Sequence, residues 1–467
     1  MCVILLVFVL CLNNACTVIK YNRPSIDDKT LFSSDTLTAS SVPFHFAEKP
    51  CYEALPDINY WVKEGIADRY TSAEDFLVQK KTSSFLVIRN DSILYESYFN
   101  GYSHDEPVII FSVSKSIVTA LAGIALSEGY FKSLQQPVAD FLPAFANDGR
   151  RDITIEHLLQ MTSGLKMEDR KNIIKLGVLY YNSSIENFVN KIKIKYKPGT
   201  HFAYKSIDTQ VLGLCLEKAT GRRLADYLKE KLWQPMGMEC DAYITLDHPH
   251  GHARSYGGIA ACARDLAKIG RLYLNKGNWN GRQLVPAEWV TRSTTICKDN
   301  GWWGYSTGWW LDTYFGENLF SKKDFTAAGY SGQRVYVNPE DNIIIVRQGN
   351  SDSGVNWSAI CARLSGLFNN CSPRNCVANP MAGDFFSGTY GKLGRRFKVT
   401  RKGENKWIAS TGFGIFRTKL RSEAPQSLFS KRRQHRYIFE TDSTHTNVIG
   451  VYFDNLRKMT YYERVGD

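Results

Sequence analysis

A serine and a lysine near the start of an apolar helix are the residues best suited to chemistry in this sequence. Ser112 and Lys115 stand three residues apart in the run FSVSK, so their side chains are neighbours on a helix. Free N–H groups at a helix N-terminus favour negative charge developing at Ser112. Lys115 is the only charged residue from Pro107 to Ser127, so we expect its amine to be buried and usable as a base. A serine needs such a partner, because its own pKa makes it a weak nucleophile.

Two other segments carry residues that would complete such a site. Tyr204 and Ser206 follow the run KPGT and come just before a predicted helix at about 207–220, so both can face inward. The run AAGYSGQ at 327–333 enters a predicted strand, and its glycines let a substrate approach the backbone and an N–H bind an oxyanion. Taken alone, Ser-x-x-Lys also fits an N-cap serine followed by a surface lysine.

The surrounding pattern indicates how these residues are positioned. Residues 84–99 read as a hairpin around Asn90-Asp91-Ser92, and residues 334–346 as a second hairpin around Pro339-Glu340-Asp341. Helices are predicted between the hairpins, at 112–128, 154–163, 207–220 and 258–275. Strands early and late with helices between them predict an α+β domain, in which one antiparallel sheet has flanking helices and an inserted helical lobe.

Five successive blocks resemble the β-lactamase-related serine hydrolases. They are FSVSKSIVTALAGIALSEGY, DITIEHLLQMTSGL, KPGTHFAYKSIDTQVLGLCLEKATG, GGIAACARDLAKIGRLYLNKGNWNGRQLVPAEWV and AAGYSGQRVYVNPEDNIIIV, in order over about residues 80–365. This family contains class C β-lactamases, DD-peptidases, esterases and 6-aminohexanoate-dimer hydrolase. The resemblance implies a β-lactamase/transpeptidase-like fold. It also implies that Ser112 is acylated, that Lys115 activates it, and that Tyr204 passes the proton to the leaving group.

The same resemblance places an oxyanion hole at the N–H groups of Ser112 and Tyr330. The residues then expected to bind substrate are Ser206, Gly329 and Gln333. One triplet departs from the family, because Ala327-Ala328-Gly329 stands where a Lys-Thr-Gly or His-Ser-Gly triplet is usual. The missing cation and hydroxyl normally help to bind a substrate carboxylate, and Arg334 is the nearby residue that could replace the charge. We therefore expect ester or amide hydrolysis rather than β-lactamase activity.

The expected partner is a small-molecule or peptide-like ester or amide, with no nucleic acid, and the chemistry needs no metal or cofactor. The alternatives are a DD-peptidase or β-lactamase, or a non-catalytic envelope protein that binds a ligand with this fold. Two other motifs are set aside. Gly304–Gly308 matches G-x-S-x-G but lacks a following helix. His248-Pro-His-Gly-His252 reads as a surface loop rather than a metal site.

The two ends of the chain carry separate predictions. Residues 1–16 have the length of a signal peptide, which predicts export to a bacterial periplasm or outer envelope. The sequence around Cys16 resembles a lipoprotein cleavage site, in which Cys16 would carry the lipid anchor. A plain cleaved signal peptide is the alternative. We expect a lead-in at 17–75, the hydrolase domain at 76–370, a linker at 371–383 and a small basic β-barrel or sandwich at 384–467. That last domain shows six strand-like runs.

Overall fold

The computed structural model describes residues 23–48, 55–56, 58, 62, 69–169, 173–295, 304–311, 323–351, 354–369, 388–392, 395–403, 406–411, 416–424, 427–430, 435–441, 448–454 and 459–466. The chain forms two compact units, of which the first contains Leu77–Tyr314 and Ser321–Ser358 and the second contains Ala359–Asp467. The expected signal peptide with Cys16 and the expected linker at 371–383 lie outside the described residues.

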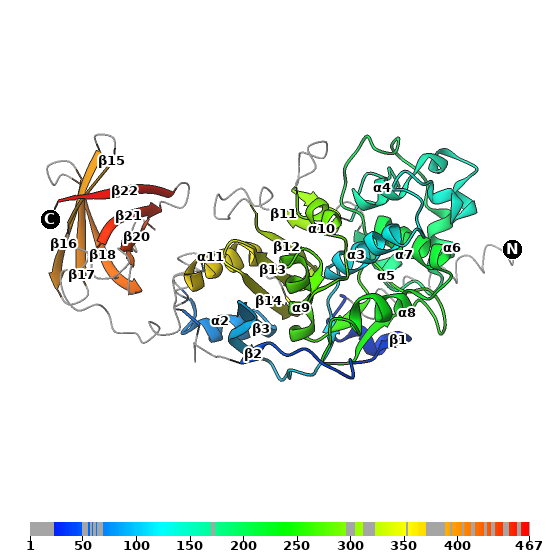
Figure 1. The fold of residues 1–467 in the computed structure, drawn as a ribbon, viewed down its shortest axis with the longest axis horizontal. Helices are drawn as coiled ribbons and strands as arrows, with labels where there is room; N and C mark the ends of the chain where they lie inside the picture. Colours follow the sequence, from blue (N-terminus) through cyan, green and yellow to red (C-terminus); the bar gives the residue numbers. More distant parts are fainter. Residues whose placement is uncertain are drawn as a thin grey trace. The chain divides into compact units, whose positions relative to one another are not determined.

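The main sheet of the first unit has eight strands in the order β10-β11-β12-β13-β14-β3-β4-β2 (Figure 1). Neighbours run antiparallel, except that β2 and β4 are parallel. The strands are β2 (Ala47–Glu48), β3 (Thr82–Arg89), β4 (Ser92–Tyr98), β10 (Tyr305–Ser306), β11 (Trp309–Leu311), β12 (Phe325–Ala328), β13 (Arg334–Asn338) and β14 (Ile343–Gly349). Because β14 pairs with β3, early and late strands complete one sheet, as the sequence predicts.

Both predicted hairpins of this sheet are present, and each turns through left-handed backbone. Asn90 and Asp91 connect β3 to β4 with φ of 49° and 57°. Two consecutive positive φ values match the twist of the flanking strands, and Asn and Asp tolerate them better than most side chains. Asn342 has φ of 55° directly before β14. Turn chemistry therefore fixes the register of four of the eight strands.

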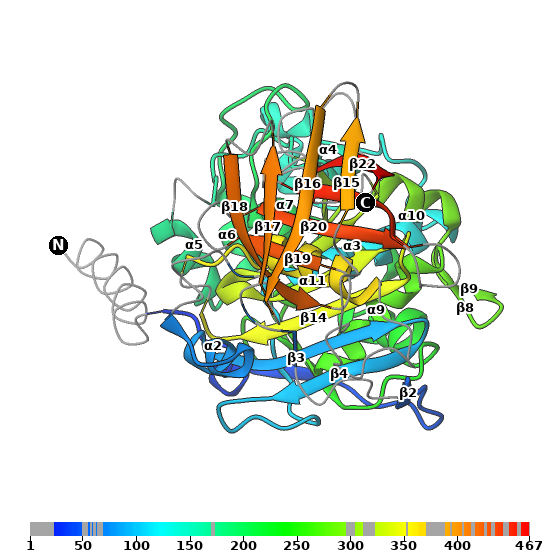
Figure 2. The same ribbon diagram turned by 90° about the vertical axis from the view of Figure 1, so that its left-hand side faces the viewer.

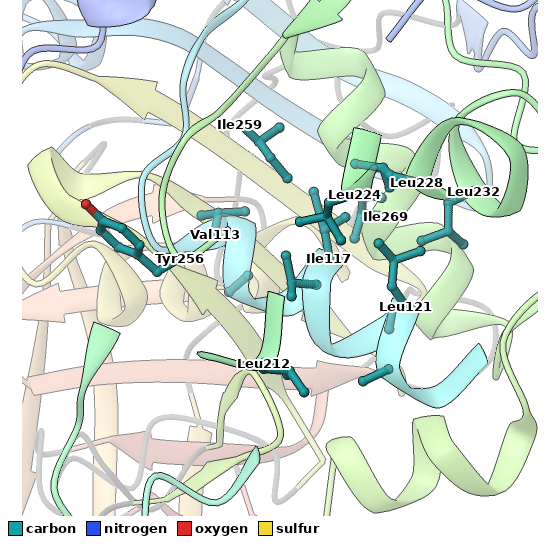
Figure 3. Packing of buried hydrophobic residues seen from close by; sticks show 14 of the residues in the cluster. Val113, Ile117, Leu121, Leu212, Leu224, Leu228, Leu232, Tyr256, Ile259 and Ile269 are labelled. Atoms are coloured by element: carbon teal, nitrogen blue, oxygen red, sulfur yellow. The ribbon is translucent and has the colours of Figure 1, made fainter. Parts of the chain in front are cut away.

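The helical lobe is built around α3, whose residues from Val113 to Ala125 are all buried. Ile117 and Leu121 of α3 share one apolar cluster with Leu212 of α7 (Figure 3). Each such aliphatic side chain stabilises the fold by about 1.5–3 kcal/mol relative to exposure. None of the described helices has the length and apolar character needed to cross a membrane. The helices are α2 (Ala73–Gln79), α3 (Val113–Ser127), α4 (Ile155–Leu159), α5 (Ile173–Tyr180), α6 (Ile185–Lys191), α7 (Ser206–Thr220), α8 (Leu224–Leu228), α9 (Ala263–Leu274), α10 (Ala287–Ser293) and α11 (Trp357–Asn369).

A second, four-stranded sheet leads the chain into α3. Its order is β1-β6-β7-β5, with β1 (Ser34–Leu37), β5 (Val108–Ile109), β6 (Ala242–Thr245) and β7 (Ile259–Ala261). The prediction of a helix from residue 258 was wrong in its first turn, because residues 259–261 pair with β5 and β6 and the helix begins at Ala263. The segment expected as a lead-in supplies β1 to this sheet and β2 to the main one. Tertiary pairing outweighs local helical preference here.

The described strands from residue 388 onward form a closed antiparallel barrel, drawn in orange and red in Figure 2. It is closed by pairing of β15 with β22. Six of its strands match the predicted runs, whereas β18 and β19 were not predicted, because β18 is rich in charge and β19 has only four residues. The strands are β15 (Gly388–Lys392), β16 (Arg395–Gly403), β17 (Lys406–Thr411), β18 (Phe416–Ala424), β19 (Ser427–Ser430), β20 (His435–Thr441), β21 (Val448–Asp454) and β22 (Met459–Gly466).

Candidate active site

Ser112 immediately precedes α3, at the point where the chain leaves β5. The Ile110 N–H donates to the Ile259 carbonyl at 2.9 Å, which ties the chain to β7 before it turns. Phe111 then has φ of 47°, a left-handed conformation that is uncommon for a residue other than glycine. Strained backbone of this kind is found mostly at functional sites. It places the half-buried Ser112 at the N-terminus of a buried helix.

Lys115 is 1% exposed, and its amine points back to Ser112. The Nζ donates to Ser112 Oγ at 2.8 Å, to Ser206 Oγ at 3.0 Å and to the Tyr256 carbonyl at 2.9 Å. Burial lowers the pKa of Lys115 to about 8, while the nearby Asp169 carboxylate opposes the change. With a pKa of about 8, roughly a tenth of the amine is neutral at pH 7 and can accept a proton.

Tyr204 lies on the loop ahead of α7, and its ring centroid is 5.2 Å from Lys115 Nζ. Burial raises the pKa of the Tyr204 phenol, the Asp169 charge raises it further, and a hydrogen bond with Ser112 lowers it. The phenol is therefore neutral in the resting site and suited to passing a proton rather than to holding negative charge. The structure thus brings Ser112, Lys115 and Tyr204 together, as the sequence analysis expected of them.

Ser206 is buried behind Lys115, so its position differs from the one expected of a substrate-binding residue. Its Oγ accepts from Lys115 Nζ and donates to Asp169 Oδ2 at 2.7 Å, and its N–H donates to Asp169 Oδ1 at 2.9 Å. These contacts occupy the hydroxyl and direct it at the lysine. The sequence analysis missed Asp169, which follows α4 in the run KMED and carries no motif that would single it out.

Gly329 brings the end of β12 close to the start of α3. A Cβ on Gly329 would lie 2.5 Å from the Ile110 carbonyl oxygen, so only glycine fits this approach. Tyr330 begins the short turn Tyr330–Gly332, and its ring lies 5.4 Å from that of Phe111. The Tyr330 backbone is therefore close to Ser112. An oxyanion hole at the N–H groups of these two residues stays a prediction.

Gln333 and Arg334 contact protein rather than open space. The Gln333 side chain is fully buried, and its amide exchanges two hydrogen bonds with the backbone of Gly349. The expectation that Gln333 binds substrate is not supported by this geometry, because both polar atoms are already used. Arg334 donates to the carbonyls of Gly329 and Gln333 at 3.3 and 2.7 Å, so it stiffens the turn.

Three aromatic rings form an aromatic wall beside the nucleophile, made of Tyr204, Tyr305 and Trp310. Their centroids are 5.1 to 5.6 Å apart. Ser306, the middle residue of the G-x-S-x-G match, is buried in β10 and donates to the Arg292 carbonyl. It lies in a β-hairpin rather than before a helix, so it is not a nucleophile elbow.

The histidine-rich loop is held by carboxylates. His252 Nδ1 lies 2.7 Å from Glu217 and its Nε2 lies 3.1 Å from Glu186, which accounts for both ring nitrogens. These contacts raise the pKa of His252, with the Glu217 hydrogen bond as the main cause. In the part of the chain that the structure describes, no group of three His, Cys, Asp or Glu residues is arranged to bind a metal.

Comparison with known proteins agrees with this geometry. Residues 75–359 match the Beta-lactamase family. The 6-aminohexanoate-dimer hydrolase of Paenarthrobacter ureafaciens is 27% identical over 308 residues, which are 61% of this chain and 76% of the relative. A protein named "Putative D-alanyl-D-alanine carboxypeptidase", from Escherichia coli K12, is 21% identical over 370 residues, 64% of this chain and 82% of its own.

A solved structure titled "Putative 6-aminohexanoate-dimer hydrolase from Bacillus anthracis" has a similar fold. It gives a TM-score of 0.62 at 20% identity and covers 74% of this chain and 92% of its own. The expected β-lactamase/transpeptidase-like fold is thereby confirmed. Because the family match extends over most of the main sheet, the helical lobe and the residues around Ser112, this chain belongs to the Beta-lactamase family of serine hydrolases.

Proposed function

We propose that the protein hydrolyses ester or amide bonds through an acyl-enzyme on Ser112. The observation that carries the proposal is the 2.8 Å contact between Ser112 Oγ and the buried amine of Lys115. A hydroxyl becomes a useful nucleophile when a base with a pKa near the working pH lies within hydrogen-bond reach. The lowered pKa of Lys115 meets that condition.

The reaction needs two proton transfers for each acyl transfer. Ser112 Oγ attacks the carbonyl carbon while its proton passes to neutral Lys115, directly or through Tyr204. Tyr204 then donates a proton to the leaving alkoxide or amine and regains one from Lys115. Water attacks the acyl-enzyme in the second half, with the same two residues accepting its proton and returning one to Ser112. The oxyanion formed in each half is bound by the backbone N–H groups of Ser112 and Tyr330.

The same site favours neutral substrates over β-lactams. The end of β12 carries Ala327 and Ala328, which supply no cation for a substrate carboxylate, and Nη1 of the nearby Arg334 is directed at the backbone carbonyls of Gly329 and Gln333. The aromatic wall offers apolar contact beside Ser112 instead. We therefore expect an ester or amide with an apolar group next to the scissile bond.

An active-site probe tests the proposal. A fluorophosphonate should label Ser112 in the wild-type chain, as peptide mass spectrometry would show, and Ser112→Ala should abolish both labelling and turnover. Ser306→Ala is the matched control and should retain both. The wild type should hydrolyse a p-nitrophenyl ester but not nitrocefin.

Three other results of these assays would contradict the proposal. Turnover of nitrocefin would favour a β-lactamase. A folded wild-type protein without label on Ser112 would leave only a ligand-binding role. Loss of label in Ser306→Ala but not in Ser112→Ala would overturn the assignment of the nucleophile.

A further inference from the structure

Asp169 connects three segments of the site by hydrogen bonds. Its Oδ1 accepts from the Ser206 N–H at 2.9 Å and its Oδ2 accepts from Ser206 Oγ at 2.7 Å. Its own backbone N–H donates to the Tyr204 carbonyl at 3.2 Å. One residue therefore binds the first residue of α7 at both polar groups and the loop that carries Tyr204.

The direction of each hydrogen bond follows from the available protons. A serine hydroxyl has one proton, and a carboxylate can only accept, so the Ser206 proton goes to Asp169. The Ser206 oxygen then presents a lone pair to Lys115 Nζ at 3.0 Å. The chain thus runs in a fixed order from Lys115 through Ser206 to Asp169. In the neutral amine, one N–H then donates to Ser206, the other donates to the Tyr256 carbonyl, and the nitrogen lone pair is left to face Ser112.

Asp169 also acts on Lys115 by its charge. Of the groups near Lys115, the Asp169 carboxylate is the one whose charge opposes the loss of the lysine's proton. A second buried lysine, Lys205, has its own partner in Asp208, at 3.9 Å. The titratable groups that face Asp169 are Lys115, Lys205, Asp208, Tyr204, Tyr256 and Tyr305.

We propose that Asp169 is a positioning residue for acyl transfer, which holds Lys115 against Ser112 through Ser206 and places a carboxylate behind that lysine. The inference rests on the proposed function. When Lys115 takes the proton of Ser112, it becomes an ammonium separated from a buried carboxylate by Ser206, and the attraction between the two charges stabilises the transition state that leads to it. The same charge makes the resting lysine more difficult to deprotonate.

Removing the charge should therefore have two opposite effects. Asp169→Asn keeps an oxygen for the Ser206 N–H, but its NH2 group donates to Ser206 Oγ, so the Ser206 proton turns towards Lys115. Lys115 should lose its proton at lower pH, which moves the acid limb of the pH–rate profile to lower pH. The plateau should fall about tenfold, comparable to the loss of outer hydrogen-bond partners at metal sites. A role in folding alone would leave the acid limb where it is.

The test measures the rate of Ser112 labelling by a fluorophosphonate against pH in the full-length wild type, Asp169→Asn and Asp169→Ala. Asp265→Asn is the matched control, since Asp265 is a buried carboxylate that, like Asp169, accepts two hydrogen bonds from other segments, here both from backbone N–H groups, and it contacts a buried lysine, Lys268. Its acid limb should match that of the wild type. Circular dichroism confirms that each variant is folded.

The outcomes separate this inference from the proposed function. A folded Asp169→Asn variant with an unshifted acid limb would refute the inference while labelling of the wild type upheld the function. An equal shift in Asp265→Asn would also refute it, because the effect would then be general. A folded wild type that is never labelled at Ser112 would overturn both.

Discussion

Two buried lysines in the first unit contact the same number of oxygen atoms, but those oxygen atoms belong to different kinds of group. Lys115 at the start of α3 and Lys268 on α9 are 1% and 0% exposed. Each amine has three oxygen atoms within 3.0 Å. Those of Lys115 are two hydroxyls and a carbonyl. Those of Lys268 are the Gly237 carbonyl and the carboxylates of Asp265 and Glu239.

The difference indicates that two equally buried lysines can differ in how their amines are neutralised. Carboxylates in direct contact neutralise an ammonium, and the resulting cluster ties α9 to the segment before β6. Hydroxyls orient the amine without neutralising it, so burial lowers the pKa of Lys115. The one carboxylate that acts on Lys115, Asp169, does so across Ser206. We expect the first lysine to matter for rate and the second for stability.

Replacing the reactive lysine should give the largest effect. Lys115→Met keeps the volume of the side chain but removes the base, so kcat/KM for a p-nitrophenyl ester should fall about 10²–10⁴-fold. Steady-state assays measure this loss, and chemical denaturation should show a smaller change in unfolding free energy than for Lys268→Met. Activity within a few-fold of the wild type would show that Lys115 is not the base.

Replacing the paired lysine should act on stability instead. Lys268→Met leaves the buried Asp265 without its cation, while Glu239 keeps Arg264 and His45 as partners, and the change should lower the free energy of unfolding by about 3–5 kcal/mol. Urea denaturation measures the change. Labelling of Ser112 in the protein that remains folded should match the wild type. A large loss of labelling without loss of stability would remove the distinction between the two lysines.

The pH dependence of the rate should report Lys115. Since the lysine works as a neutral base with a pKa of about 8, kcat/KM should rise about tenfold per pH unit below that value and level off above it. Between about 8 and the ordinary value of 10.5 the unfolded chain binds more protons, so stability should rise with pH in that range. A rate that is flat from acid to neutral pH would contradict this assignment.

His252 lies between the two lysines in character, because it is half-buried and contacts two carboxylates, those of Glu217 and Glu186. Its pKa is raised in the folded chain, so the stabilisation is complete below its ordinary pKa and is lost as pH rises through the raised value. His252→Gln should lower the free energy of unfolding by up to about 1 kcal/mol in mild acid and less in alkali. Thermal melts at the two pH values measure it, and an equal loss at both would exclude the ion pairs as its cause.

The sequence predicts the parts of the site that are encoded locally. Ser112 and Lys115 lie on one turn of one helix, and the uncharged surroundings of Lys115 already indicate burial. The position of Tyr204 just before a predicted helix is also local, and its role follows from the resemblance to the family. The two hairpins could also be predicted, because their turn residues are local in the sequence.

The remaining features depend on contacts between distant segments. Asp169 acquires its role only when the segment after α4 lies against α7. Gln333 is occupied by Gly349, and Ser206 by Asp169, and neither pairing has a local sequence pattern. The sequence of β7 predicts a helix, but these residues form a strand because they pair with β5 and β6. The sequence thus predicted which residues lie together around Ser112 more reliably than which residues support them.

The attachment of the β10–β11 hairpin bears on how this enzyme family could diversify. Ser116 and Thr119 on α3 donate to the backbone carbonyls of Gly308 and Thr307 at 2.7 and 3.0 Å. The hairpin is thus anchored by its main chain, whereas Tyr305 and Trp310 contribute their side chains to the aromatic wall. Tyr204 belongs to the same wall and contacts both rings, so mutation of Tyr305 or Trp310 would change substrate contact and also the packing of the proposed proton shuttle. Substrate range and reaction chemistry are therefore coupled through the wall, even though the main-chain anchor stays in place.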